Sequence, residues 1–434
     1  MASHGVTRTV RTRTEEQKQQ DLDKIKKYRD LEEEVRVNIA KNNFTLEVFQ
    51  LTSKLLRLNP EYYTIWNVRR RLLISGLLSR PSAGSSPSTA SPTSSRNDTT
   101  TPSSAAYSSS SSTTTRPVPS SQTAGKNGTT ADATGGFPAE ARATGGSDDA
   151  PQSNQDAEKD LAVLRSELEF TIPLLMSFPK CYWIWGYRLW VLQKAIERLA
   201  VPVARRIWEE ELGLVSKMVT KDRRNFHAWG YRRQVVAQLE SPELDGSSMV
   251  EAEFEYTTRM IRADLSNFSA WHNRSKLIPR LLDERKANDL ARKGFFDAEL
   301  NLIRDALNVG PDDQSLWYYH QFLMLDLVEY AARPTVTPRF TLEERVTYLT
   351  RELEDMKDLL IDYDDCKLIY ENLIDYTLAL CQLEERAPDE QEKRCLTEWL
   401  ESLRKLDPMR EGRWNDLEKT IKLQRSGRSS LDIR

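Results

Sequence analysis

The chain lacks most features that mark a secreted, membrane-spanning or nucleic-acid-coating protein. It has only four cysteines in 434 residues, without close pairing, which argues against a disulfide scaffold and fits a reducing compartment. No stretch approaches the roughly 20 apolar residues of a membrane span, and the basic N-terminal segment has no apolar core of a signal peptide. A net charge of only −3 excludes a polycation built to coat nucleic acid. We therefore expect a soluble cytoplasmic protein.

The chain does contain a repeated pairing of tryptophan with a basic residue three positions later. The pairs are Trp66–Arg69, Trp185–Arg188, Trp229–Arg232, Trp271–Arg274 and Trp317–His320. From the second pair onward the tryptophans are 44, 42 and 46 residues apart. A period in this range is typical of an array of helical pairs, in which each unit buries its apolar face against the next.

Apolar periodicity predicts the helices of these units. The expected pairs are Phe44–Asn59 with Ile65–Leu78, Leu161–Phe178 with Ile184–Leu199, Val203–Val219 with Ala228–Leu239, Val250–Ala263 with Ala270–Leu282, and Gly294–Val309 with Leu316–Tyr330. Glu343–Ile361 and Leu368–Leu383 form a degenerate sixth pair with Tyr370 in place of tryptophan, as expected of an end cap. Glu15–Val37 reads as a highly charged N-terminal helix.

One long insertion interrupts the array. Residues 80–155 consist of Ser, Thr, Pro, Gly and Ala with almost no large apolar side chain, so we expect them to be disordered. The predicted organisation is therefore a charged helix with the first helical pair at 1–79, the insertion at 80–155, and the remaining pairs with a C-terminal cap at 156–434. The insertion reads as a tolerated surface segment, or alternatively as a site of regulatory phosphorylation.

The recurring residues are interpreted as structural. Three residues along a helix return to the same face, so each tryptophan and its arginine point together into the hairpin junction. Tryptophan supplies an apolar plate between units, and arginine is expected to ion-pair or to bond turn carbonyls. Functional residues are then sought where the units differ. Lys180 lies in the turn before a helix N-terminus, and Arg224 and His227 lie in the next turn, which indicates a seat for a phosphate or diphosphate.

The sequence motifs of the units resemble those of protein prenyltransferase α subunits. The residues that carry the resemblance are Pro179-Lys180-Cys181-Tyr182-Trp183-Ile184-Trp185, Asn225-Phe226-His227-Ala228-Trp229 and Asn267-Phe268-Ser269-Ala270-Trp271. The start of the chain, with Tyr62-Tyr63-Thr64-Ile65-Trp66, and the fifth unit, Asp312 to His320, are similar to the Rab geranylgeranyltransferase (type II) α subunit in particular.

The resemblance implies an all-α fold, a right-handed crescent in which antiparallel helical hairpins form an α–α superhelix. It also implies an obligate heterodimer with a β subunit, an α–α barrel that carries the catalytic zinc. The enzyme transfers geranylgeranyl from geranylgeranyl diphosphate to C-terminal cysteines of Rab GTPases that an escort protein presents. In this chain the histidines and cysteines form no short-spaced zinc ligand set, and His4 is expected to lie in a mobile tail.

The same resemblance assigns roles to particular residues. Lys180 matches the family's lysine that faces the diphosphate, where a fixed ammonium stabilises charge on the leaving group. Tyr182 and His227 match positions that face the active site across the subunit boundary, with packing or hydrogen bonding as the alternative, and Arg224 is interpreted as interfacial.

Two alternative functions stay open at this point. The chain is alternatively the α subunit shared by farnesyltransferase and the CaaX geranylgeranyltransferase, although Trp183 replaces the glutamine of that type, a position associated with the CaaX carboxylate. Gln314-Ser315 also favours the Rab type. The alternative from another class is a non-catalytic helical-repeat scaffold.

The structural interpretation of the tryptophans predicts a large stability loss on truncation. Trp229→Ala removes a buried aromatic plate between units and is expected to cost ~3–5 kcal/mol in the free energy of unfolding. A denaturant or thermal melting curve checks this, and an unchanged curve contradicts the structural role.

Overall fold

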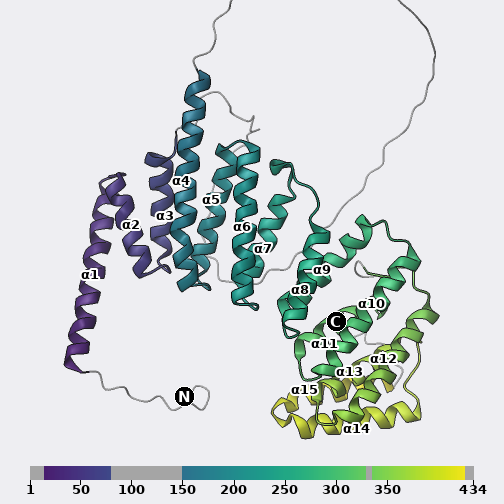
Figure 1. Ribbon diagram of the computed structural model, residues 1–434. Coiled ribbons are helices and arrows are strands. Elements are labelled where there is room, and N and C mark those ends of the chain that lie inside the picture. The colour runs from purple at the N-terminus through teal and green to yellow at the C-terminus, as the bar shows by residue number, and fades with distance from the viewer. Residues whose placement is uncertain (1–13, 80–148, 329–334, 426–434) are drawn as a thin grey trace, which may run out of the picture. The chain divides into compact units, whose positions relative to one another are not determined.

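The computed structural model describes residues 14–79, 149–328 and 335–425 (Figure 1). All of the regular secondary structure in these residues is helical. His4 lies outside these residues, as does most of the predicted insertion at 80–155. The helix that follows begins at Asp149, inside the last part of that predicted insertion. Of the described residues, those from 14 to 78 and from 157 to 425 fall in one compact unit.

The helices follow one another as seven pairs after an N-terminal helix, α1 (Glu15–Ala40). We number these pairs as hairpins 1 to 7: α2 (Leu46–Leu58) with α3 (Tyr63–Leu72), α4 (Asp149–Ser177) with α5 (Tyr182–Arg198), α6 (Val201–Lys221) with α7 (Phe226–Leu239), α8 (Val250–Ala263) with α9 (Phe268–Glu284), α10 (Asp289–Val309) with α11 (Gln314–Val328), α12 (Leu342–Asp362) with α13 (Lys367–Leu383), and α14 (Glu390–Leu406) with α15 (Glu411–Arg425). Short elements are η1 (Leu73–Leu77), η2 (Pro242–Leu244) and η3 (Pro408–Arg410).

The predicted all-α repeat architecture is confirmed, and the helix ends differ from the predicted ones by a few residues in most cases. The C-terminal end differs more. The sixth pair is not the last, because hairpin 7 follows it with Trp414 in the repeat position. The charged α1 packs on hairpin 1, where Tyr62 donates to Glu32 at 2.8 Å and Asn59 donates to Tyr28 at 3.1 Å.

Each repeat tryptophan fastens its helix to the turn that precedes it. The indole N–H donates to a backbone carbonyl six residues earlier at 2.6–3.0 Å, in the bonds Trp66–Pro60, Trp185–Pro179, Trp229–Arg223, Trp271–Leu265 and Trp317–Pro311. Tyr370 makes the same bond with its hydroxyl, to Asp364 at 2.8 Å. Hairpin 6 therefore keeps the contact although its tryptophan is replaced.

The repeat arginines connect consecutive hairpins. Two roles were expected for these arginines, an ion pair or a hydrogen bond to a turn carbonyl. The turn carbonyl is bonded by tryptophan instead, and the arginine forms the ion pair. The Nε and Nη2 atoms of each arginine donate to both oxygens of a glutamate in the first helix of the next hairpin, in the pairs Arg69–Glu167, Arg188–Glu211, Arg232–Glu253 and Arg274–Glu299. All eight side chains are buried. The remaining Nη1 atom donates to a side-chain hydroxyl in the first helix of the same hairpin. Arg232, for example, donates to Ser216 at 2.7 Å.

Tyrosine completes the coordination of three of these carboxylates. The hydroxyls of Tyr187, Tyr231 and Tyr319 donate to Glu167, Glu211 and Glu299 at 2.5–2.6 Å. Burial, followed by the neighbouring carboxylate, raises the pKa of each tyrosine well above its usual range, so the hydroxyl remains a donor. A buried carboxylate with a bidentate arginine and a hydroxyl donor is fully satisfied, which is the condition under which a buried ion pair is tolerated.

The ion pairs stop where the array stops. Each glutamate lies 18 residues before the aromatic of its own hairpin, as Glu167 does before Trp185. Hairpin 1 has no earlier hairpin to pair with and carries Val48 at that position, and hairpin 7 carries Leu396. Hairpin 6 correspondingly has Leu373 in place of the arginine. The charges therefore appear only where a neighbour neutralises them.

Hairpin 5 also forms a buried ion pair with the next hairpin, but different residues supply the positive charge. His320 occupies the arginine position, with Nε2 3.0 Å from Glu352 and Nδ1 2.8 Å from the Tyr376 hydroxyl. Arg304, at the position where hairpins 1, 3 and 4 have a hydroxyl, supplies the guanidinium to Glu352. Burial would raise the pKa of Glu352, but the bonds from His320 and Arg304 outweigh it and hold the pKa below its usual value.

Removing one partner of such a pair is expected to cost more than removing both. Arg232–Glu253 is the best test because Asn273 replaces the tyrosine there, so few other groups are disturbed. Arg232→Met leaves Glu253 buried and unpaired and should lower the free energy of unfolding by about 3–5 kcal/mol, whereas adding Glu253→Met should restore most of it. Urea unfolding measures both variants.

The matched control is the exposed pair Arg285–Glu251, whose side chains are 43% and 55% exposed. Arg285→Met should change the free energy of unfolding by less than about 1 kcal/mol. Equal losses for the buried and the exposed pair would contradict the account of how the hairpins are held together.

Candidate functional site

The turns of consecutive hairpins lie next to each other and form one edge, which we call the turn edge. It comprises, in hairpins 1 to 5, the turn between the two helices and the first residues of the second helix. Direct bonds between neighbouring turns define it: Cys181 Sγ to Pro60 O at 3.5 Å, Asn225 Nδ2 to Pro179 O at 3.1 Å, and Ser315 Oγ to Ser266 O at 3.2 Å. The sequence-predicted site residues all lie on this edge.

Lys180 lies in the turn of hairpin 2, two residues before α5. Its side chain is 74% exposed, and Nζ is 3.9 Å from the carboxylate of Asp222, which caps the C-terminus of α6. An ion pair at this distance and exposure contributes little. The ammonium is thus available to an anion at a helix N-terminus, where the unpaired backbone N–H groups also favour negative charge.

The side chains of Tyr182 and His227 lie next to each other. Tyr182 begins α5 and is 65% exposed, while the half-buried His227 is the second residue of α7. Their ring centroids are 6.2 Å apart in an edge-to-face arrangement. Lys180, Tyr182 and His227 therefore lie on two adjacent turns, which the bond from Asn225 to Pro179 joins.

Arg224 points away from this group. Its guanidinium donates to Asp264 of the next turn at 3.3 and 3.4 Å. The pair repeats, one hairpin later, the relation between Lys180 and Asp222. Arg224 is therefore a link between turns 3 and 4, and the structure does not bring it to Lys180 as a second anion ligand.

A row of exposed aromatic side chains extends the site along the turn edge, which the sequence analysis did not predict. Hairpins 1 to 4 each carry one three residues before the repeat tryptophan: Tyr63, Tyr182, Phe226 and Phe268, which are 47–75% exposed. Trp183, next to Tyr182, packs on Tyr63 with ring centroids 5.3 Å apart. The signal in the sequence was the aromatic residue recurring at this one position. Large aromatics gathered on one exposed edge mark a surface that another molecule covers.

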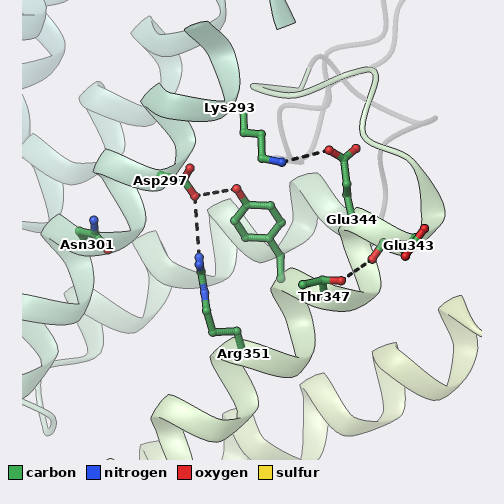
Figure 2. Close-up of a pocket in the computed structure, with 8 residues that line it drawn as sticks. Lys293, Asp297, Asn301, Glu343, Glu344, Thr347 and Arg351 are labelled. Carbon is green, nitrogen blue, oxygen red and sulfur yellow. Dashed lines mark hydrogen bonds and ion pairs between the residues drawn. The ribbon is translucent and has the colours of Figure 1, made fainter. Parts of the chain in front are cut away.

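A groove away from the turn edge is lined mostly by paired charged side chains. It lies between α10 and α12, has a volume of about 450 Å³ and is lined by polar side chains (Figure 2). Most of its charged side chains are paired: Lys293 pairs with Glu344 at 3.1 Å, and Asp297 accepts from Tyr348 at 2.6 Å and pairs with Arg351 at 3.8 Å. Among residues 14–79, 149–328 and 335–425 no cluster of histidine, cysteine and carboxylate side chains has a metal-binding arrangement. Nor is any helix in these ranges long and apolar enough to cross a membrane.

Comparison with known proteins identifies the repeat. The family described as "Protein prenyltransferase alpha subunit repeat" matches residues 46–75, 164–195, 208–239, 250–281 and 296–327, which fall on hairpins 1 to 5. Over hairpins 1 to 5 the chain therefore has the repeat of the protein prenyltransferase α subunits.

The relatives narrow this class further. The chain is similar to the geranylgeranyl transferase type-2 subunit alpha of Candida albicans, with 29% identity over 95% of this chain and 96% of that one. The subunit of the same name from Saccharomyces cerevisiae is 28% identical over 95% of this chain and 97% of its own length. The one from Bos taurus is 35% identical over 39% of this chain and 28% of its own length. These names agree with the type-II resemblance seen in the sequence.

The site predicts the reactivity of the cysteine beside Lys180. Cys181 is buried against Pro60 O, and burial raises the pKa of its thiol to about 11; burial likewise raises the pKa of Cys366 to about 11 and of Cys381 to about 12. The thiol is the unreactive form, so at pH 8 these three should resist a thiol reagent, whereas the half-buried Cys395 reacts. Titration with a chromogenic disulfide checks this: one thiol in the native protein and four after unfolding. Labelling of Cys181 as fast as Cys395 would show that the Lys180 turn opens.

Proposed function

We propose that the chain is the α subunit of a heterodimeric Rab geranylgeranyltransferase that works in the cytoplasm. The pair transfers geranylgeranyl from geranylgeranyl diphosphate to C-terminal cysteines of Rab GTPases presented by an escort protein. The observation that carries the proposal is Lys180: an exposed ammonium at a helix N-terminus, with only a loose carboxylate partner and with Tyr182 and His227 beside it.

The chemistry assigns Lys180 a role in the transition state. The thiolate of the Rab cysteine forms a bond to C1 of the geranylgeranyl group, and the C1–O bond breaks with its electron pair passing to the diphosphate. Negative charge therefore grows on the departing diphosphate, where a positioned ammonium and the N-terminal amides of α5 stabilise it. The ordinary lysine charge suffices, and no proton transfer by this side chain is required.

The aromatic row supports a partner that covers the turn edge. Tyr63, Trp183, Phe226 and Phe268 expose large apolar rings on the edge that carries Lys180. A β subunit seated there would bury these rings and enclose the reacting groups away from water. We assign the zinc of the reaction to that subunit, where it lowers the pKa of the substrate thiol.

Trp183 favours the Rab type over the farnesyltransferase type. Its indole stacks on Tyr63 and presents a broad apolar face beside Tyr182. Such a face has no group of the kind that binds a terminal carboxylate, which the CaaX enzymes must recognise. A scaffold without catalysis remains the rival from another class, and the exposed ammonium of Lys180 is what speaks against it.

The test is transfer of labelled geranylgeranyl to a Rab GTPase with escort protein, with each subunit alone and with both. Transfer is expected only with both. Lys180→Ala should then slow the chemical step on the order of 10- to 100-fold, as for a lost contact to developing charge, without loss of the heterodimer. Lys54→Ala, at an exposed lysine of α2, is the control and should leave the rate unchanged.

Two results would contradict the proposal. Efficient transfer by the Lys180→Ala pair in single-turnover measurements would remove the lysine from the mechanism. Transfer to a CaaX peptide and none to Rab would move the chain to the farnesyltransferase type.

A further inference from the structure

Asn225 connects the two turns that hold the candidate site. Its side chain is 1% exposed and lies at the N-cap of α7. The Oδ1 atom accepts from the backbone N–H groups of His227 and Ala228 at 3.0 and 3.2 Å. The Nδ2 atom donates to the carbonyl of Pro179 at 3.1 Å, in the turn of the preceding hairpin. One buried amide therefore fastens the helix of His227 to the turn of Lys180.

The carbonyl of Pro179 is held from two sides. It accepts from Asn225 Nδ2 and from Trp185 Nε1 at 3.0 Å. Its oxygen belongs to the peptide group that joins Pro179 to Lys180, and the proline ring restricts the preceding backbone angle. Two donors on a planar peptide group leave little freedom at the Lys180 backbone, although the Lys180 side chain itself stays exposed. The two hydrogen bonds therefore fix the backbone position from which the Lys180 side chain extends.

The carbonyl equivalent to Pro179 O receives a weaker donor, or no side-chain donor from the next turn, in the other hairpins compared here. The residue that corresponds to Asn225 is Cys181 in hairpin 2 and Cys366 in hairpin 6, and each offers a thiol, a weak donor, to the carbonyls of Pro60 and Pro311 at 3.5 and 3.3 Å. In hairpin 4 it is Asn267, which caps α9 by accepting from Ala270 at 3.1 Å while its buried Nδ2 has no hydrogen-bond partner. Among the carbonyls of these described turns, that of Pro179, next to Lys180, is the one that accepts from a side-chain amide.

We propose that Asn225 is a positioning residue for transfer: it acts through Lys180 by setting where the ammonium originates relative to Tyr182 and His227. The inference rests on the proposed function. Asn225 would then control the rate without touching the substrate. A small displacement of the Lys180 ammonium is enough to weaken a contact that is made only in the transition state.

Asn225→Asp separates the two bonds of this side chain. Aspartate is as good an N-cap as asparagine and keeps the bonds to α7. It cannot donate to Pro179 and places an oxygen against that carbonyl. We expect the heterodimer to form and kcat for transfer to fall about 10- to 100-fold, with KM for geranylgeranyl diphosphate changing much less. The matched control is Asn267→Asp, which keeps its cap and removes an amide that has no partner, and should retain the wild-type kcat.

A second arm tests whether Asn225 acts through Lys180. In the Lys180→Ala background, Asn225→Asp should have little further effect on kcat, because the group that it positions is already gone. An independent loss of the same size in both backgrounds would show a merely structural role and overturn the proposal. So would wild-type kcat in Asn225→Asp.

Two further measurements keep the outcomes distinct. If the buried aspartate prevents folding, Asn225→Ser provides a neutral cap that is too short to bond Pro179, and the same loss of kcat is expected. Wild-type protein is assayed in parallel with its partner subunit. An inactive wild-type heterodimer would remove the proposed function itself, whereas an active wild type with an equally active Asn225→Asp and Asn225→Ser would remove only the role of Asn225.

Discussion

The rest of the structure depends on the buried ion pair that joins each hairpin to the next. A forked guanidinium from the second helix of one hairpin binds both oxygens of a carboxylate from the first helix of the following hairpin, as Arg188 does with Glu211. Such a pair adds little net stability compared with apolar packing, but an unpaired member is strongly penalised. It therefore selects one relative placement of neighbours, since a slipped hairpin would leave two buried charges without partners.

This placement carries over to the turn edge. Because the hairpins are in register, their turns lie next to each other, and backbone carbonyls such as Pro179 O become available to the next hairpin. Tyr182 and His227, 45 positions apart in the chain, come into contact for that reason. The repeat builds the frame, and the site consists of the side chains in which adjacent turns differ. Under the proposed function, a site of this kind needs no change in the architecture, only in the exposed residues at two or three turns.

The sequence predicts much of this fold and less of its connections. Tryptophan periodicity locates the first five hairpins correctly because the indole contact is local to each one. The partner of the arginine could not be predicted, since Glu211 lies in another hairpin at a distance set by packing and not by helix periodicity. Hairpin 7 escaped because Trp414 is followed by Leu417, without the basic residue that defined the pattern. Of the candidate site, Lys180, Tyr182 and His227 were proposed from the sequence, but the bonding of Asn225 could be seen only in the structure.

A structure of the chain bound to the proposed β subunit and a non-reactive analogue of geranylgeranyl diphosphate tests the central claim most directly. The account predicts that the partner covers the turn edge, that Tyr63 and Phe226 become buried, and that Lys180 Nζ lies about 3 Å from a diphosphate oxygen. A complex in which the partner contacts the opposite ends of the helices, with Lys180 left in solvent, would contradict it.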